Sequence, residues 1–72
     1  MPLSMFSSGE SGTIHRISGR GDTKRFLKNL GFAEGNSVTV INKMEGNMIV
    51  RVMDSRIAIG KNMANKIMME RN

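Results

Sequence analysis

The side chains that could carry out chemistry are few and scattered along the 72 residues of the chain. The sequence holds a single histidine, His15, no cysteine and six acidic residues. Covalent catalysis needs a nucleophile, a base and a group that orients the base, and no part of the sequence places three such residue types together. Without cysteine there is also no thiolate zinc site and no disulfide. We therefore expect a protein that is not an enzyme.

The stretch Gly19-Arg20-Gly21 has some likeness to a phosphate cradle. It precedes a predicted helix, and the N-terminus of a helix attracts anions. The stretch lacks the glycine spacing of a dinucleotide fingerprint, and no Lys-Ser or Lys-Thr pair of a P-loop follows it. We interpret it as a turn, so the sequence predicts no nucleotide site.

His15 lies between Ile14 and Arg16 in a predicted strand. A ferrous or zinc ion needs two or three converging nitrogen or carboxylate ligands, which one chain with a lone histidine does not supply. We therefore interpret His15 as an exposed strand residue, and the sequence requires no cofactor. The alternative is Fe(II), or another divalent transition metal, that two copies of the chain share through His15. Whether the chain forms a homo-oligomer stays open.

Positive charge dominates the composition, because eleven Lys and Arg against six Asp and Glu give a net charge of +5. This balance favours an acidic partner, such as a nucleic acid, an anionic membrane surface or an acidic protein. Binding of single-stranded nucleic acid also needs aromatic stacking platforms, and the chain has three Phe and no Trp or Tyr. We favour a solvated basic face near an acidic protein over a small barrel that binds single strands. The basic residues considered are Arg16, Arg20, Lys24, Arg25, Lys28 and Lys61.

Methionine is unusually frequent, with eight residues in the chain. Its side chain fills irregular gaps in cores and also forms adaptable binding surfaces. We expect most of the methionines to fill the core, with Met48 facing inward and the neighbours Met68 and Met69 pointing to opposite faces of a strand. The alternative is a soft docking patch near predicted turns, formed by Met44, Met53 and Met63.

A series of short strands must position these side chains. Turn residues separate five β-rich segments, at residues 12–18, 37–43, 48–53, 56–59 and 66–70. Ile14 and Ile17 differ in parity, which predicts a bulge in the first strand. Residues 61–65 are expected to form one helical turn. The pattern predicts a mainly β protein, a small and strongly bent barrel of about five strands that occupies residues 1–72 as one domain.

One short amphipathic helix is predicted between the first two strands, over residues 22–30. Asp22 is the expected N-cap and Gly31 the expected C-cap. The apolar stripe expected to pack on the barrel consists of Phe26, Leu27 and Leu30. The helix is our candidate docking element, and its expected partner contacts are Lys24, Arg25, Leu27 and Lys28.

Residues 25–35, with the sequence Arg-Phe-Leu-Lys-Asn-Leu-Gly-Phe-Ala-Glu-Gly, and the following Val38-Thr39-Val40 resemble the signature of the ferrous iron transport protein A (FeoA) family. Residues 54–60 and 63–67 are similar to the closing pattern of that family. The family usually has Pro-Gly where this chain has Glu34-Gly35, and Gly35 keeps the backbone freedom that a turn with positive φ requires. The resemblance implies an SH3-like barrel, with Gly31 and Gly35 shaping the turn after the helix.

The resemblance also implies a role in bacterial ferrous iron uptake. It implies a small cytosolic adaptor or regulator that contacts FeoB, a membrane permease that hydrolyses GTP. The chain has no apolar run of about eighteen residues that could span a membrane and no secretory signal pattern, so we expect a cytoplasmic protein. It has no phosphate-binding loop either. Transport and GTP hydrolysis would therefore belong to the partner.

Overall fold

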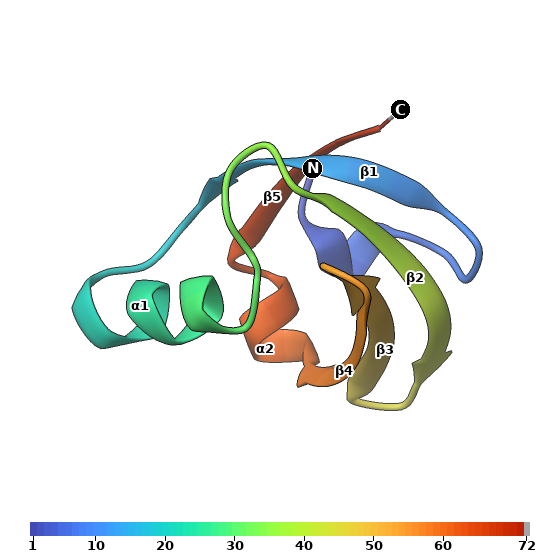
Figure 1. The fold of residues 1–72 in the computed structure, drawn as a ribbon. Coiled ribbons are helices and arrows are strands. Elements are labelled where there is room, and N and C mark those ends of the chain that lie inside the picture. The colour runs from blue at the N-terminus through green and yellow to red at the C-terminus, as the bar shows by residue number, and fades with distance from the viewer. Residues whose placement is uncertain (72) are drawn as a thin grey trace.

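The structure is a computed structural model that describes residues 1–71. Its five antiparallel strands form one sheet in the order β4-β3-β2-β1-β5, which curls around a single core (Figure 1). Along the chain the elements are a 3-10 turn (Leu3–Met5), β1 (Ser11–Ile17), α1 (Gly21–Asn29), β2 (Ser37–Met44), β3 (Asn47–Val52), β4 (Ser55–Gly60), α2 (Lys61–Ala64) and β5 (Ile67–Arg71). The mainly β barrel with a helix between the first two strands is confirmed.

A bulge in β1 bends the sheet. The pairing of β1 with β5 shifts between Ile14 and Arg16, which leaves His15 as the extra residue. Ile14 and Ile17 are consequently both buried, although a flat strand would point them to opposite faces. A second shift lies in β2 where it pairs with β3. Bulges strengthen the local twist, so these two shifts help a small sheet to close around its core, as the parity of the two isoleucines predicts.

The turn between β3 and β4 differs from the prediction. Met53 and Asp54 both have positive φ, 50° and 65°, which is the conformation of a type I′ hairpin turn. Glycine and asparagine are the usual residues there, and a left-handed conformation at another residue costs roughly 1 kcal/mol. The sequence placed the turn one residue later, at Asp54-Ser55, because nothing in the residue type of Met53 indicates a positive φ.

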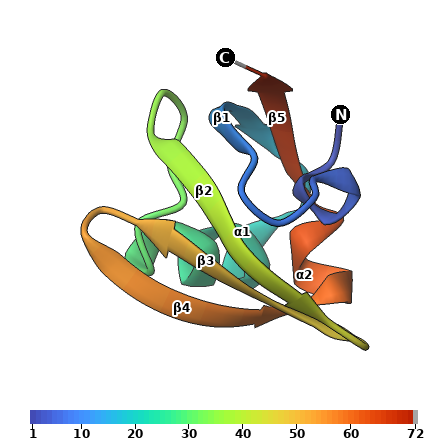
Figure 2. The ribbon, with the colours of Figure 1, turned by 90° about the vertical axis from the view of Figure 1, so that its right-hand side faces the viewer.

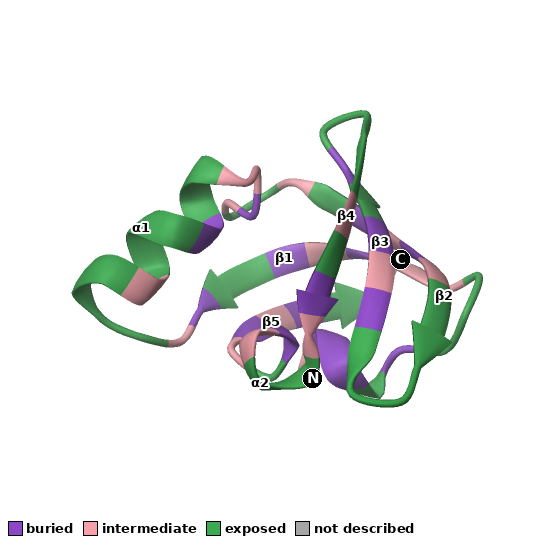
Figure 3. Ribbon diagram, turned by 90° about the horizontal axis from the view of Figure 1, so that it is seen from below, coloured by how far each residue is buried: buried purple, intermediate pink, exposed green. Residues whose placement is uncertain are grey.

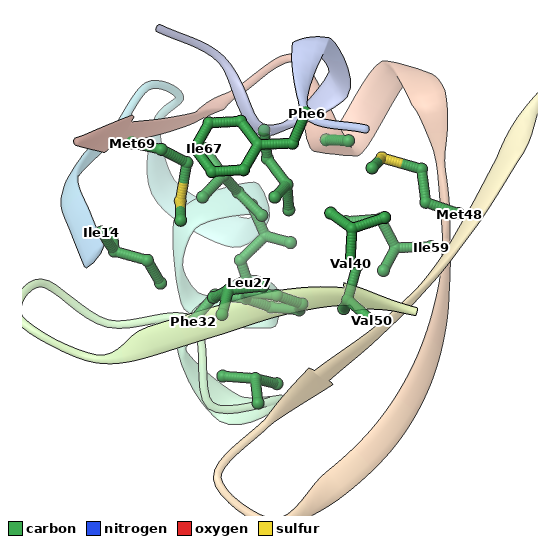
Figure 4. Packing of buried hydrophobic residues seen from close by; sticks show 14 of the residues in the cluster. Phe6, Ile14, Leu27, Phe32, Val40, Met48, Val50, Ile59, Ile67 and Met69 are labelled. Carbon is green, nitrogen blue, oxygen red and sulfur yellow. The ribbon is translucent and has the colours of Figure 1, made fainter. Parts of the chain in front are cut away.

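The core draws side chains from every strand, from α1 and α2, and from the N-terminal residues (Figure 4). Met48 and Met69 are buried, while Met68 is only partly covered, so the adjacent pair on β5 does face both ways. Phe6 lies against β1, where Gly12 has no side chain to displace it. The buried apolar residues are Leu3, Phe6, Ile14, Ile17, Leu27, Phe32, Val38, Val40, Met48, Val50, Val52, Ile59, Ala64, Ile67 and Met69.

The two edges of the sheet differ in how far other parts of the chain cover them. At the β5 edge the backbone N–H of Met69 donates to the carbonyl oxygen of Met1 at 2.6 Å, and the amino group of Met1 donates to the carbonyl oxygen of Met69 at 2.9 Å. Pro2 forms a bridge to Met68 beside them. The N-terminal residues therefore cover part of that edge. At the other edge β4 is the outermost strand (Figure 2).

α1 begins one residue earlier than predicted. Arg20 occupies the N-cap position without a side-chain hydrogen bond, and Asp22 lies within the first turn, so the predicted N-cap is wrong. The carboxylate of Asp22 instead pairs with the guanidinium of Arg25 at 2.8 Å. The helix is capped at its C-terminal end by Leu30, and Gly31 follows at a φ of 106°, a conformation that glycine adopts at little cost.

Candidate interaction surfaces

The outer side of α1 carries a row of basic residues. Lys24, Arg25 and Lys28 are all exposed, and most of α1 is coloured as exposed in Figure 3. Arg25 is occupied by its ion pair with Asp22. Within the part of the chain that the structure describes, Lys24 and Lys28 have no acidic partner. These two ammonium groups can therefore meet acidic groups of another molecule.

A groove of about 300 Å³ runs beside this row. Lys24 and Lys28 lie one helical turn apart on its wall, which places their side chains on one face of α1. Glu34 is the acidic residue of the lining, and apolar side chains complete it. The lining residues are Ile17, Lys24, Lys28, Phe32, Ala33 and Glu34. A groove with this lining can accept an apolar group that carries a negative charge.

The helix faces the barrel differently from the prediction. Leu27 is completely buried, whereas Phe26 is 52% exposed, so Leu27 cannot contact a partner and Phe26 is not a core residue. Consecutive residues in a helix point about 100° apart, so only one of the two can point straight at the barrel. Leu30, three residues after Leu27, packs partly against the core, so it lies on the same barrel-facing side of α1 as Leu27. Phe26 is thereby an exposed aromatic side chain next to the basic row, which the sequence pattern did not indicate.

The predicted methionine patch does not form. Met44 ends β2, whereas Met53 lies in the turn between β3 and β4. These positions are at opposite ends of the six-residue strand β3, whose length is about 20 Å. Met63, in α2, is partly buried against the core. Met44 and Met53 are exposed, but the three residues share no single surface.

Gly31 and Gly35 flank the segment that leads from α1 to β2, and both have positive φ, 106° and 88°. A Cβ atom on Gly31 would lie 3.1 Å from Cγ of Met53. The end of α1 therefore lies directly against the β3–β4 turn. At Gly35 the space around the missing Cβ is open, so this glycine serves the backbone conformation alone.

His15 is exposed and has a partner that the sequence did not indicate. Its Nδ1 lies 3.0 Å from Oε1 of Glu70, on the neighbouring strand β5. Among residues 1–71 no group of three or more His, Asp or Glu side chains could hold a metal ion. The alternative from the sequence is a divalent ion that two copies of the chain share through His15. That alternative stays a prediction from the sequence.

No helix among residues 1–71 is long and apolar enough to cross a bilayer. The fold is that of a small SH3-like barrel with one helix inserted after its first strand. The family model of the FeoA domain matches residues 1–71, and the chain belongs to the FeoA family.

Two named relatives are similar to nearly all of this chain. A protein of Methanocaldococcus jannaschii, named as a candidate Fe(2+) transport protein A, is 32% identical over 69 residues, which are 96% of this chain and 84% of the relative. A protein of Porphyromonas gingivalis, named as a fusion of Fe(2+) transport protein A with the Fe(2+) transporter FeoB, is 29% identical over 72 residues. The match covers 97% of this chain but only 8% of the fusion protein.

Solved structures show the same fold. An iron uptake regulatory protein (FeoA) superposes with a TM-score of 0.93 at 29% identity, over 100% of this chain and 96% of the other. A zinc complex of FeoA from Stenotrophomonas maltophilia, described as a prokaryotic SH3 domain protein, has a TM-score of 0.87 at 22% identity. That match covers 97% of this chain and 89% of the other. At such identity the second likeness concerns the fold alone.

Proposed function

We propose that this chain is an accessory protein of ferrous iron uptake that binds a FeoB-type GTPase permease at its cytoplasmic side. The observation that supports this most directly is the Porphyromonas gingivalis relative, in which a segment similar to nearly all of this chain belongs to the same polypeptide as a FeoB transporter. A covalent link raises the effective concentration of two domains, so a fusion makes sense for domains that bind each other. A domain of this kind that is not linked to its permease would have to find it by affinity.

The exposed face of α1 suits a protein partner. Phe26 presents an aromatic side chain, and Lys24 and Lys28 present charges that form no ion pair among residues 1–71. Aromatic anchors beside basic groups are typical of binding hot spots and of charge-steered association. The proposal assigns this face to an acidic surface of the permease, and it assigns no reaction to the chain itself.

The alternative of single-strand nucleic-acid binding finds little support in the arrangement of the aromatic rings. Stacking needs such rings on the surface, and two of the three phenylalanines, Phe6 and Phe32, are completely buried. Phe26 alone is left to stack on a base, so the basic face has no row of platforms for successive bases.

Reversing both charges of the α1 groove, Lys24→Glu with Lys28→Glu, should weaken binding of the solubilised permease about tenfold or more, because attraction becomes repulsion at a charged contact. Both side chains are exposed, so the melting temperature should stay nearly unchanged. A matched control is Lys61→Glu, an exposed charge reversal at the start of α2. Binding would be measured by calorimetric titration at two salt concentrations. Equal affinities of the double variant, the control and the wild type would show that α1 is not the docking face.

A further inference from the structure

The outer side of β4 is an unpaired sheet edge. β4 pairs with β3 on one side only. On its other side no backbone group of Arg56 or Ala58 bonds to any part of residues 1–71. Unpaired strand edges are templates for another strand, and proteins usually blunt them with cover, charge or proline. The β5 edge is covered at Met69 by Met1, but β4 has no such cover within the described residues.

The pairing of β4 with β3 determines which of its backbone groups point outward. Val52 and Ser55 flank the type I′ turn, so they form the hydrogen-bonded pair that closes the hairpin. Opposite residues in an antiparallel pair alternate between bonded and non-bonded. Ile57 and Ile59 therefore direct their N–H and C=O groups toward β3, as Ser55 does.

The alternation continues to the end of the strand. The N–H of Lys61 donates to the carbonyl oxygen of Gly46 at 3.0 Å, which is the bond that this pattern requires two residues after Ile59. Arg56 and Ala58 have the other parity, so their N–H and C=O groups point away from β3. Both residues are exposed. Two donors and two acceptors are thus spaced to receive one additional strand.

The charge beside this edge indicates the kind of strand. Arg56 lies directly opposite Arg51 of β3, and like charges at opposite positions destabilise a sheet. Both arginines are exposed, and neither has an ion pair among residues 1–71. Asp54 lines a shallow pocket with Arg51, yet the two form no ion pair. The open edge is therefore bordered by two positive charges that the described part of the chain does not neutralise.

We propose that β4 accepts an extended, acidic segment of the partner protein as a sixth strand of the sheet. The backbone groups of Arg56 and Ala58 would hold the segment, and an acidic side chain opposite Arg56 would neutralise the arginine pair. This mode of recognition uses main-chain bonds for affinity and side chains for specificity. The inference rests on the proposed function, because it assumes a protein partner.

A second copy of this chain fits the edge less well. Pairing two β4 strands about a twofold axis, with Arg56 opposite Ala58 of the copy, would satisfy the same backbone groups. It would also gather Arg51 and Arg56 of both copies on one face of four adjacent strands. Four positive charges within reach of one another oppose this pairing, whereas an acidic strand reduces the repulsion already present.

The location of the edge is consistent with the α1 contact. The β3–β4 turn meets the end of α1, where Met53 lies against Gly31. A segment lying along β4 would thus leave the sheet next to the helix that carries Phe26 and Lys28. One partner could engage both surfaces without a rearrangement of the barrel.

Hydrogen exchange of the full chain, alone and with the solubilised FeoB-type permease, tests the inference residue by residue. Binding should slow exchange of the Arg56 and Ala58 amides at least tenfold, while the amides of Ile57 and Ile59, which already bond to β3, should change little. Slowing at Arg56 and Ala58 that depends on the concentration of the chain alone would identify a second copy as the occupant and overturn the proposal.

Two test variants and one control variant show whether the β4 edge itself binds the permease. Ala58→Pro removes an outward N–H without breaking a bond to β3, a position where an edge strand tolerates proline. It should weaken permease binding about tenfold, whereas Ala58→Val, which keeps the N–H, should bind as the wild type does. Arg56→Glu should weaken binding to a similar extent and alters no backbone group, so it tests the edge even if Ala58→Pro does not fold.

The outcomes distinguish the two proposals. If the permease binds the wild type, but Ala58→Pro and Arg56→Glu bind equally well and exchange at Arg56 and Ala58 is unchanged, strand addition is wrong and the proposed function stands. If the permease does not bind the wild type at all, both proposals are wrong.

Discussion

Replacing Gly12 by alanine should destabilise the protein by about 3 kcal/mol, at the upper end of the usual cost of overpacking. A Cβ atom there would lie 2.6 Å from the carbonyl oxygen of Glu70 and 2.9 Å from two ring carbons of Phe6. Neither contact can relax easily, because Gly12 pairs with Val38 on one side and with Arg71 on the other. The strand is thus held between two neighbours, and Phe6 is completely buried.

Chemical denaturation of purified Gly12→Ala would measure this loss as a lower midpoint. The matched control is Gly60→Ala, because Gly60 has an ordinary φ of −71° and the nearest atom, Oδ1 of Asn47, would be 3.9 Å from the added Cβ. The control should lie within about 0.5 kcal/mol of the wild type. Equal midpoints for the two variants would mean that Phe6 does not pack on β1 as described.

Truncation of Leu27 to alanine should cost about 3 kcal/mol, since it leaves a cavity beneath α1. The side chain is completely buried among the core residues (Figure 4), and the carbonyl oxygen of Leu27 accepts a hydrogen bond from the N–H of Phe32 at 3.0 Å. The same truncation at the adjacent Phe26 should cost less than about 1 kcal/mol, because that ring is half exposed. A chain of this size has a total stability of only about 5 kcal/mol, so the difference is large.

Comparing Leu27→Ala with Phe26→Ala also distinguishes the side chain that packs α1 on the barrel from the side chain that binds the permease. Thermal melting should report the loss at Leu27, and permease titration with folded protein should report the loss at Phe26. The assignment of the two faces would be reversed if Phe26→Ala melted at the lower temperature.

Much of the barrel follows from local pattern. The β-branched runs of β2 and β3 and the turn glycine Gly46 predict the central hairpin, and the parity of Ile14 and Ile17 predicts the bulge in β1. These features depend on residues that are near one another in the sequence, so the sequence of a single chain predicts them.

The candidate surfaces depend on how the elements pack and pair in space, which the order of residues in the sequence does not show. Phe26 and Leu27 are adjacent apolar residues, and only the way α1 rests on the barrel decides that Leu27 is buried. Met44 and Met53 both lie near turns, yet β3 separates them, so proximity to turns did not bring them together. Glu70 became a neighbour of His15 through the pairing of β1 with β5, which joins the two ends of the chain.

The role of Glu34 also becomes visible only in the structure. The resemblance to the family led us to expect proline at this position, and Gly35 carries the positive φ of the turn in its absence. Glu34 instead adds a carboxylate to the groove beside Lys24 and Lys28. The sequence pattern showed a missing constraint on the backbone, whereas the structure shows a charge in a candidate binding groove.

The central claim is that the chain works by contact with a FeoB-type permease. Calorimetric titration of the full chain into the detergent-solubilised permease of the same organism tests it most directly. We expect saturable binding in the micromolar range or tighter, weakened by added salt because basic groups steer the contact. Absence of saturable binding at low salt, with a permease that still hydrolyses GTP, would contradict this claim.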